Sequence, residues 1–399
     1  MLFVTLSKID SLQTKGIYTD LLRQFAAEGH QVYVATPIER RFGEPTKYLI
    51  CEDVKLLKIS TLNITKTNVF EKGIGTLLLE YQFNRAIKKH LGEVAFDLVL
   101  YSTPPITLTA VIKGIKRRCN AISYLMLKDI FPQNAVDMGM FSRRSLFYKF
   151  FRHKEQMLYK TADFIGCMSP ANCAYILSHN PTLPPQKVEL CPNSLQITAC
   201  ESVDKLDVRQ RYGLPIDKRI FIYGGNLGKP QGIDFLLRVL ESNRHNGDVY
   251  FVVIGSGTEY HKIQTWYQQQ HPQNVKLFES LPTVEYDRLV QSCDVGMIFL
   301  DARFTIPNYP SRLLSYIGHA MPVILATDSN TDVGTIATAN GYGLWSLHGD
   351  LNSFNENLHL LISMSKDQLE TMGNQGYRYF CAHYDVKQAY RTIVSHFMK

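Results

Sequence analysis

The chain has 399 residues, of which 45% are hydrophobic and 20% charged, a balance typical of a folded protein rather than a disordered one. This length exceeds what one hydrophobic core usually serves, so we expect two domains. The net charge of +7 is uneven, because residues 1–198 carry 25 Lys and Arg against 16 Asp and Glu. The first half should therefore attract an anionic partner: a phospholipid, a nucleic acid or a phosphorylated acceptor.

The eight cysteines form no Cys-x-x-Cys pair, which favours reduced thiols in a cytosolic protein over a disulfide framework. The segment Met1–Ser7 lacks the basic start and long apolar run of a signal peptide, and it is expected to form the first strand. No stretch approaches the ~20 apolar residues that a transmembrane helix needs. Any membrane contact is therefore expected to be peripheral.

Strand-like runs alternate with amphipathic helical runs, which is the pattern of α/β domains with parallel sheets. The expected elements of the first half are, in chain order, strand Leu2–Leu6, helix Gly16–Gly29, strand Gln31–Thr36, helix 75–91, strand Asp97–Tyr101, helix 105–118, strand Ala121–Met126, helix 142–161, and strands Phe164–Met168 and Val188–Cys191. An irregular stretch over 192–215 indicates a linker.

The second half continues the alternation. Its expected elements are strand Arg219–Tyr223, helix Asp234–Glu241, strands Val249–Ile254 and Val275–Phe278, helix Thr283–Ser292, strands Val295–Leu300 and Val323–Ala326, and a last helix Lys387–Phe397. We predict one doubly wound domain over 1–195, a second over 196–380, and a C-terminal helix over 381–399 that packs back on the first domain. The carboxyl ends of both sheets would face a central cleft.

Glycines follow two strands of the second half. Gly225, Asn226 and Gly228 lie between a strand and a helix, where glycine lets backbone N–H groups approach a phosphate and Lys229 can add charge. Gly255 follows the next strand in a Val-Ile-Gly-Ser-Gly run. A plain strand-to-helix turn remains the alternative for both runs. Neither is the Gly-x-Gly-x-x-Gly fingerprint, which weakens a nicotinamide interpretation.

The run from Asn308 to Leu325 predicts a loop, a short helix and a buried strand. The Ser311 hydroxyl can cap that helix. A cation in the first turn is unfavourable for the helix dipole, so Arg312 suggests a bound anion. A guanidinium matches phosphate oxygens in a bidentate manner, and the N–H groups of Ser311, Arg312 and Leu313 would point to the same ligand. The alternative is that Arg312 is a solvated surface residue.

The order of these motifs resembles the C-terminal domain of family 4 retaining glycosyltransferases, which have the GT-B fold. In the first half, the motifs similar to the members that build bacterial O-antigens, capsules and exopolysaccharides are Gly-His-Gln-Val at 29–32, Ser-Thr-Pro-Pro at 102–105, Lys-Asp-Ile-Phe-Pro at 128–132 and Pro-Asn-Ser at 192–194. The resemblance implies transfer of a sugar from a nucleotide sugar, here a UDP-sugar, to a lipid-linked saccharide. It implies neither a metal nor another cofactor.

The resemblance also assigns residues to this reaction. The nucleotide sugar would contact Lys229, Ser311, Arg312, Leu313 and the turn Gly225–Gly228 at the diphosphate, Ser315 at the ribose, and Gly255, Leu281 and Pro282 near the base. Asp129 would lie near the reacting centre, with a turn cap as the alternative role, and Lys128 would be a surface group.

Two departures from the family pattern keep other functions open. Pro307 and Ser315 stand where many members carry a pair of glutamates, the second of which holds the ribose. A serine hydroxyl binds a ribose hydroxyl less strongly than a carboxylate does. A non-catalytic assembly partner is therefore one alternative, and a GT-B nucleotide-sugar 2-epimerase is another, which would need acid and base residues placed for proton transfer.

Helix 142–161 carries six Lys and Arg against a single Glu. Its apolar residues fall on one stripe at helical spacing, and they are Leu146, Phe147, Phe150, Phe151, Met157 and Leu158. A basic amphipathic helix can lie on an anionic membrane, which predicts a cytoplasmic protein that is peripheral on the inner membrane. The alternative is a core helix with a solvated polar face. Nucleic acid is not expected as a partner, because no recognisable binding module accompanies the charge.

Overall fold

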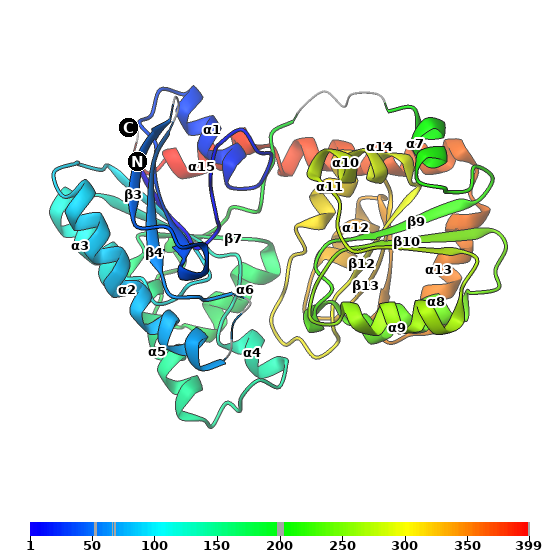
Figure 1. The fold of residues 1–399 in the computed structure, drawn as a ribbon, viewed down its shortest axis with the longest axis horizontal. Helices are drawn as coiled ribbons and strands as arrows, with labels where there is room; N and C mark the ends of the chain where they lie inside the picture. The colour runs from blue at the N-terminus through cyan, green and yellow to red at the C-terminus, as the bar shows by residue number, and fades with distance from the viewer. Residues whose placement is uncertain (52–53, 66, 68, 198–202, 398–399) are drawn as a thin grey trace. The chain divides into compact units, whose positions relative to one another are not determined.

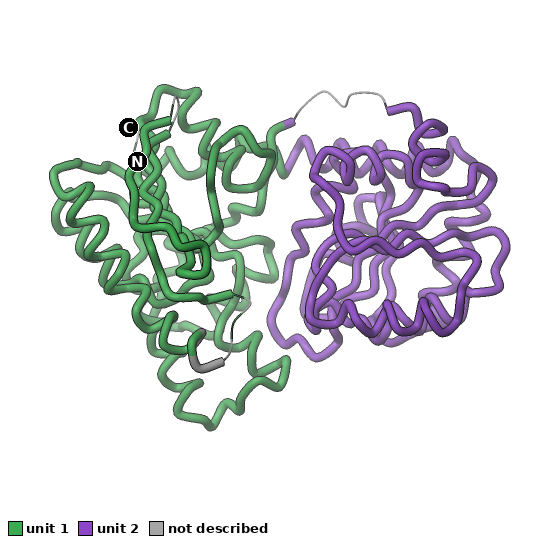
Figure 2. The backbone as a smooth tube through the Cα atoms, in the orientation of Figure 1, with its two compact units in different colours: residues 1–196, 384–399 green, residues 197–383 purple. Residues whose placement is uncertain are grey.

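The computed structural model describes residues 1–51, 54–65, 67, 69–197 and 203–397, with the backbone alone at 69, 70 and 72. The chain forms two compact units, residues 1–196 with 384–399 and residues 197–383 (Figure 2). Each unit is a mainly parallel sheet covered by helices (Figure 1). Part of the expected linker, residues 198–202, and the end of the expected last helix, residues 398–399, lie outside the described residues.

Unit 1 contains an eight-stranded sheet in the order β3-β4-β2-β1-β5-β6-β7-β8. Its elements are β1 Leu2–Val4, α1 Thr19–Ala27, β2 Tyr33–Glu39, β3 Lys47–Cys51, β4 Val54–Thr61, α2 Val69–Leu91, β5 Leu98–Ser102, α3 Thr109–Cys119, β6 Ile122–Met126, α4 Gln133–Asp137, α5 Leu146–Thr161, β7 Phe164–Cys167, α6 Pro170–His179, β8 Val188–Leu190 and α15 Val386–Val394. All neighbouring strands pair in parallel except β3 and β4, which are antiparallel.

Strands β3 and β4 were not predicted, because their sequences lack the unbroken apolar run of a buried parallel strand. β4 is nevertheless mostly buried, and its two lysines are accommodated by polar partners. Lys55 Nζ donates to Tyr33 Oη at 2.9 Å, and Lys58 forms an ion pair with Asp10. The expected parallel sheet therefore carries one antiparallel strand at its edge, which is common in doubly wound folds.

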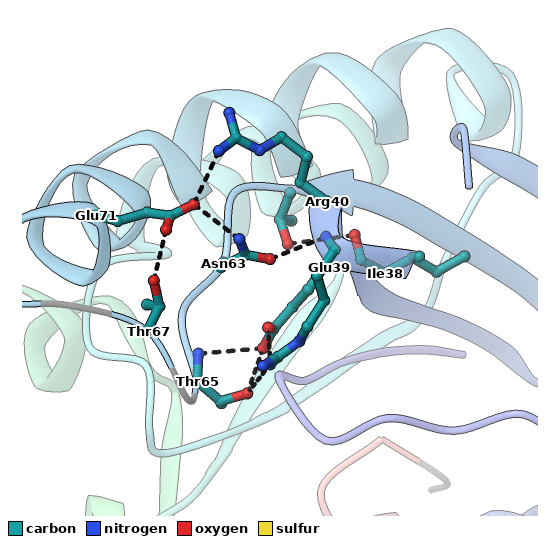
Figure 3. A network of polar contacts seen from close by, with 9 residues as sticks. Ile38, Glu39, Arg40, Asn63, Thr65, Thr67 and Glu71 are labelled. Carbon is teal, nitrogen blue, oxygen red and sulfur yellow. Dashed lines mark hydrogen bonds and ion pairs between the residues drawn. The ribbon is translucent and has the colours of Figure 1, made fainter. Parts of the chain in front are cut away.

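The polar network of Figure 3 fixes the loops after β2 and β4 against the start of α2. Glu71, in the first turn of α2, accepts hydrogen bonds from Asn63 Nδ2 at 2.8 Å and Arg40 Nη2 at 3.2 Å. Glu39 accepts from the Thr65 hydroxyl at 2.6 Å and pairs with Arg41. A carboxylate in the first turn also suits the helix dipole, so this network stabilises the entry into α2.

The C-terminal helix α15 belongs to unit 1 and packs on α1. Tyr390 makes an edge-on ring contact with Phe25, with centroids 4.9 Å apart, and its hydroxyl lies 2.9 Å from His30 Nε2. The chain joins unit 1 again where Val386 N donates to Leu195 O at 3.0 Å.

Unit 2 contains a six-stranded, all-parallel sheet in the order β11-β10-β9-β12-β13-β14. Its elements are α7 Lys205–Arg211, β9 Arg219–Gly224, α8 Ile233–Ser242, β10 Val249–Ile254, α9 Tyr260–Gln270, β11 Val275–Phe278, α10 Thr283–Ser292, β12 Val295–Phe299, α11 Arg312–Gly318, β13 Val323–Thr327, α12 Val333–Ala339, β14 Gly343–Leu347, α13 Leu351–Ser363 and α14 Lys366–His383. The edge strand β14 was not predicted.

The strand order of unit 2 is that of a Rossmann domain, in which the direction of winding reverses between β9 and β12. The central strands are apolar and fully buried, as in β10, because helices cover both faces of a parallel sheet. Ligands of such domains bind outside the carboxyl ends of the strands at the point of reversal. The predicted α/β class with two doubly wound domains is therefore confirmed, whereas a central cleft between them stays a prediction.

Candidate active site

The candidate residues of unit 2 follow the two strands between which the winding reverses. The chain leaves β9 through Gly225 and the turn to Gly228, and it leaves β12 through a loop that leads to Arg312 at the start of α11. The neighbouring strand β10 ends at Ile254 and is followed by Gly255. Because the three strands are parallel, their carboxyl ends lie at one edge of the sheet.

Gly225 and Gly255 are in direct backbone contact and both require glycine. Gly225 N donates to Ile254 O at 2.9 Å. Their φ values are +125° and +156°, which side chains rarely allow. A Cβ on Gly255 would lie only 1.7 Å from Gly225 O. The glycines thus bring the ends of β9 and β10 together, and they do so for a structural reason as well as any role at a phosphate.

Arg312 lies against the turn after β9. Its Cζ is 4.3 Å from the ring centroid of Tyr223, and its Nη2 is 3.5 Å from Asn226 O. A Cβ built on Gly225 would be 3.5 Å from the same Cζ. Arg312 Nη1 is buried, and no described residue accepts a hydrogen bond from it. Arg312 is therefore not simply a solvated surface residue, and it brings an unpaired donor to this edge of the sheet.

Two tyrosines that the sequence analysis did not single out hold the end of β9. The hydroxyl of Tyr316 accepts a hydrogen bond from Gly224 N at 2.9 Å and donates to Ile222 O at 3.3 Å. Tyr286 packs against Gly224 so closely that a Cβ there would lie 2.2 Å from its hydroxyl. Burial raises the pKa of Tyr286 to about 12, so its hydroxyl stays protonated. The available signal was spacing, since Tyr316 follows Arg312 by four residues on one helix face.

Some polar groups of the glycine turn form hydrogen bonds within the turn. Gln231 Oε1 accepts from Asn226 Nδ2 at 3.1 Å and from Gly228 N at 3.2 Å. Leu227 N donates to Ser256 O at 2.9 Å, so most of the turn amides are already paired. Lys229 is exposed, and no described residue forms an ion pair with it. Its ammonium is therefore available to a ligand.

The start of α11 differs from the expectation in two respects. Ser311 is the residue just before the helix, but its backbone angles are helical instead of the extended ones of a capping residue, and its side chain caps no N–H group. The N–H of Leu313 donates to Pro310 O at 3.2 Å, so it is not free for a phosphate. Ser315 is half-buried on α11, and Leu281 and Pro282 lie just before α10. Pro282 O accepts a hydrogen bond from Tyr286 N at 2.9 Å, so Pro282 is joined to the tyrosine that packs against Gly224.

Asp129 lies in unit 1, three residues after β6. Both of its carboxylate oxygens accept from Asn134 Nδ2 at 2.7 Å, and Thr103 Oγ1 accepts from its backbone N–H at 3.1 Å. Burial raises the pKa of Asp129 to about 6, because the charged form loses hydration. A carboxyl group that titrates near neutral pH can accept or donate a proton in catalysis. The amide pairing also fits a structural role, so both of the expected roles remain.

Lys128 is not a surface group, contrary to the expectation. Its Nζ is buried, and no described residue pairs with it. Burial lowers the pKa of Lys128 to about 8, while the nearby Cys191 and Cys167 thiols act in the opposite direction. This burial could not be recognised in the sequence, because Lys128 follows the strand in a loop and its surroundings come from other strands.

Helix α5 begins at Leu146, where the Ser145 side chain accepts from Tyr148 N at 3.1 Å. The predicted apolar stripe is divided in two. Leu146 and Phe147 are 81% and 69% exposed, whereas Leu158 is fully buried. The C-terminal half of the helix therefore packs in the core, and only the N-terminal half presents apolar side chains to solvent.

Within the described part of the chain, no group of three or more His, Cys, Asp and Glu side chains is arranged to hold a metal ion. None of the described helices is both long and apolar enough to cross a membrane.

Residues 204–378 match the family described as glycosyl transferases group 1. A probable glycosyltransferase of Pseudomonas aeruginosa, WbjE, is 20% identical over 282 residues, which are 70% of this chain and 68% of that protein. A putative colanic acid biosynthesis glycosyl transferase of Escherichia coli, WcaI, is 24% identical over 160 residues, or 38% of each chain.

Solved structures share the fold along the whole chain. Sucrose-phosphate synthase from Thermosynechococcus elongatus has a TM-score of 0.77 at 16% identity and covers 99% of this chain and 98% of its own. WaaG, a glycosyltransferase involved in lipopolysaccharide biosynthesis, has a TM-score of 0.67 at 15% identity. The match covers 98% of this chain and 99% of that chain. Anabaena HepE, solved with UDP and glucose, has 0.70 at 13% identity and covers 99% of each chain.

Proposed function

We propose that this protein, a glycosyltransferase of the GT-B fold with a group 1 domain over residues 204–378, moves a sugar from a UDP-sugar to a lipid-linked saccharide during assembly of a bacterial surface polysaccharide. The relation to a putative colanic acid biosynthesis enzyme supports the polysaccharide pathway, and the likeness to WaaG agrees with it. The likeness to HepE, which was solved with UDP, supports the choice of donor.

The observation that carries this proposal is the unpaired donor on Arg312 at the point where the sheet of unit 2 reverses its winding. A guanidinium held against Tyr223, with Nη1 buried and unpaired, suits a diphosphate placed over the carboxyl end of β9. The exposed Lys229 can add a second positive charge. Both charges would stabilise the negative charge that develops on the leaving diphosphate, which is the main source of rate acceleration in such a transfer.

The proposed transfer retains the anomeric configuration. A diphosphate oxygen would accept the proton of the acceptor hydroxyl, and Asp129 would hydrogen-bond the acceptor or the transferred sugar. Ser311 would contribute to the diphosphate site and Ser315 to the ribose. The base would lie near Gly255, Leu281 and Pro282.

We also propose that the acceptor reaches the enzyme at the cytoplasmic face of the inner membrane. The apolar side chains of α2 and of the start of α5 that are at least two-fifths exposed are Ile74, Leu77, Leu78, Tyr81, Leu146, Phe147 and Phe150. An ion pair of 3.7 Å between Lys154 Nζ and Glu80 Oε2 joins the two helices, which are neighbours in Figure 1. Two exposed basic residues suit an anionic lipid surface: Lys149 lies on α5, and Arg144 lies just before it.

A thermal-shift experiment with UDP, GDP, ADP and several UDP-sugars tests the donor site. A ligand at a hundred times its dissociation constant adds about 2.7 kcal/mol to the free energy of unfolding. We expect stabilisation by UDP compounds in the wild type and in Arg211→Met, which removes an exposed arginine of the same unit. Arg312→Met should lose most of it. Stabilisation by no nucleotide, or equal stabilisation of Arg312→Met, would contradict the proposal.

A further inference from the structure

The carboxyl ends of β6, β7 and β8 in unit 1 hold a buried ammonium group that lacks a counter-charge. Lys128 follows the last residue of β6 by two positions, and its Nζ is shielded from solvent. Among the described residues, none donates or accepts a hydrogen bond with this atom or forms an ion pair with it. A buried charge without a partner is costly and calls for an explanation, and a ligand that completes it is one.

The backbone of this lysine is held in place. Thr103 Oγ1 accepts hydrogen bonds from Lys128 N at 3.0 Å and from Asp129 N at 3.1 Å, and it donates to Asp129 O at 3.0 Å. On the preceding residue, Leu127 N donates to Gly166 O at 2.9 Å. The loop is thus tied to β5 on one side and to β7 on the other. A ligand group that meets Lys128 would meet it on a rigid support.

A second unpaired group lies at the same edge of the sheet. Asn193 follows β8 and is 5% exposed, and its Oδ1 has no hydrogen-bond donor among the described residues. The loop that carries it is fixed by Cys191 N, which donates to Cys167 O at 2.9 Å. The loops after β6 and β8 therefore flank the same strand, because Leu127 N and Cys191 N donate to Gly166 O and Cys167 O of β7.

The Lys128 ammonium and the Asn193 amide oxygen require different hydrogen-bonding partners, which one ligand can provide. An ammonium donates hydrogen bonds and prefers an anionic oxygen, whereas an amide oxygen only accepts and requires an O–H or N–H donor. A sugar that carries a carboxylate or a phosphate beside a free hydroxyl offers both. The excess of basic residues in 1–198, 25 Lys and Arg against 16 Asp and Glu, favours the same sign of ligand.

We infer that Lys128 and Asn193 bind an anionic saccharide, with Lys128 at its carboxylate or phosphate and Asn193 Oδ1 at a neighbouring hydroxyl. The inference rests on the proposed function in one respect: the anionic saccharide is taken as part of the acceptor. The inference limits the possible acceptors to saccharides that carry a carboxylate or phosphate beside the hydroxyl that Asn193 would bind. Lys128 is then a specificity residue, and the neighbouring Asp129 is left to contact the acceptor hydroxyl or the sugar.

Thermal shifts of the full chain with glucuronic acid, glucose 1-phosphate and glucose test this inference. All measurements use Arg312→Met as the background, so that phosphate binding in unit 2 does not contribute. We expect one or both anionic sugars to stabilise this protein and glucose to have no comparable effect. Adding Lys128→Met should raise the sugar concentration needed for a half-maximal thermal shift at least tenfold. Adding Asn193→Ala should raise it less. Adding Lys89→Met, at an exposed lysine of unit 1, should leave it unchanged.

A response to glucuronic acid alone or to glucose 1-phosphate alone supports the inference and identifies the oxyanion. Equal responses to glucose and the anionic sugars, no response to either anionic sugar, or a full response in Lys128→Met would overturn it. Lys128→Met removes a buried charge and keeps the volume, so it should fold, and a melting temperature without ligand that is no lower than that of its background verifies this. UDP is tested separately on Lys128→Met alone. Loss of the sugar response with an intact UDP shift in Lys128→Met separates this site from the donor site.

Discussion

The guanidinium of Arg312 lies over the ring of Tyr223, with Cζ 4.3 Å from the ring centroid. The Tyr223 hydroxyl in turn donates to Asn226 O at 2.8 Å. One tyrosine at the end of β9 therefore positions both the cation and the glycine turn of the candidate diphosphate site. A cation on an aromatic face is held without neutralising its charge, which leaves that charge for a ligand.

Replacing the ring of Tyr223 should weaken nucleotide binding. A cation–π contact contributes about 0.5–2 kcal/mol, so Tyr223→Leu should raise the dissociation constant for UDP about 3-fold to 30-fold. Tyr223→Phe keeps the ring, loses the hydrogen bond to Asn226 O, and should have a smaller effect. Titration calorimetry with UDP measures both variants. Equal dissociation constants for wild type and Tyr223→Leu would show that the ring does not position Arg312.

Gly255→Ala should destabilise unit 2 strongly. The new Cβ would lie 1.7 Å from Gly225 O at a φ of +156°, so the backbone of two strand ends must move. We expect a loss of about 3 kcal/mol or more in the free energy of unfolding. Gly247→Ala is the matched control, because its Cβ meets nothing within 4 Å and it should change stability little. Urea denaturation of the two variants measures the difference, and a similar cost for both would refute the expected clash.

Asp129→Asn should stabilise the protein at neutral pH. The folded-state pKa of Asp129 is raised to about 6, above the ordinary value, so the native state binds more protons than the unfolded state between about pH 4 and pH 6. The free energy of unfolding therefore falls as pH rises through this window and stays lower above it. Asparagine removes this cost, which is on the order of 1–3 kcal/mol.

Urea denaturation from about pH 4 to pH 8 measures this effect. The difference between Asp129→Asn and the wild type should grow up to about pH 6 and then level off. Asp248→Asn, at an exposed position, serves as the control. A constant difference across the range would mean that Asp129 does not titrate there. Transferase activity of Asp129→Asn reports separately on its proposed contact with the substrates.

Phe147→Ser should weaken binding to anionic vesicles. Phe147 is 69% exposed on α5, and burying a phenylalanine side chain contributes about 1.5–3 kcal/mol, so the partition coefficient should fall at least about 10-fold. Val284→Ser, which changes an apolar residue of unit 2 that is 63% exposed, serves as the control. Co-sedimentation with phosphatidylglycerol vesicles measures binding, with phosphatidylcholine vesicles for comparison. Equal loss in both variants would argue against α5 as the contact.

The α/β class, most of the central strands and the loops that carry the candidate residues could be recognised in the sequence. Buried parallel strands are unbroken apolar runs, such as Val249–Ile254, and these can be recognised without knowing their neighbours. The glycine turns and Arg312 were also recognised, because a strand end, a glycine and a cation in the first turn of a helix are local features. Strands β3, β4 and β14 were missed, because they lie at or near sheet edges and mix polar with apolar residues instead of forming an unbroken apolar run.

The contacts of these local features became visible in the folded chain. It placed Arg312 on Tyr223, paired the N–H of Leu313 inside its own loop, and split the stripe of α5 between core and solvent. It also buried the Nζ of Lys128, which the sequence analysis expected at the surface. Burial and pairing of a polar atom depend on neighbours from other strands, and a single sequence does not specify which residues those neighbours are.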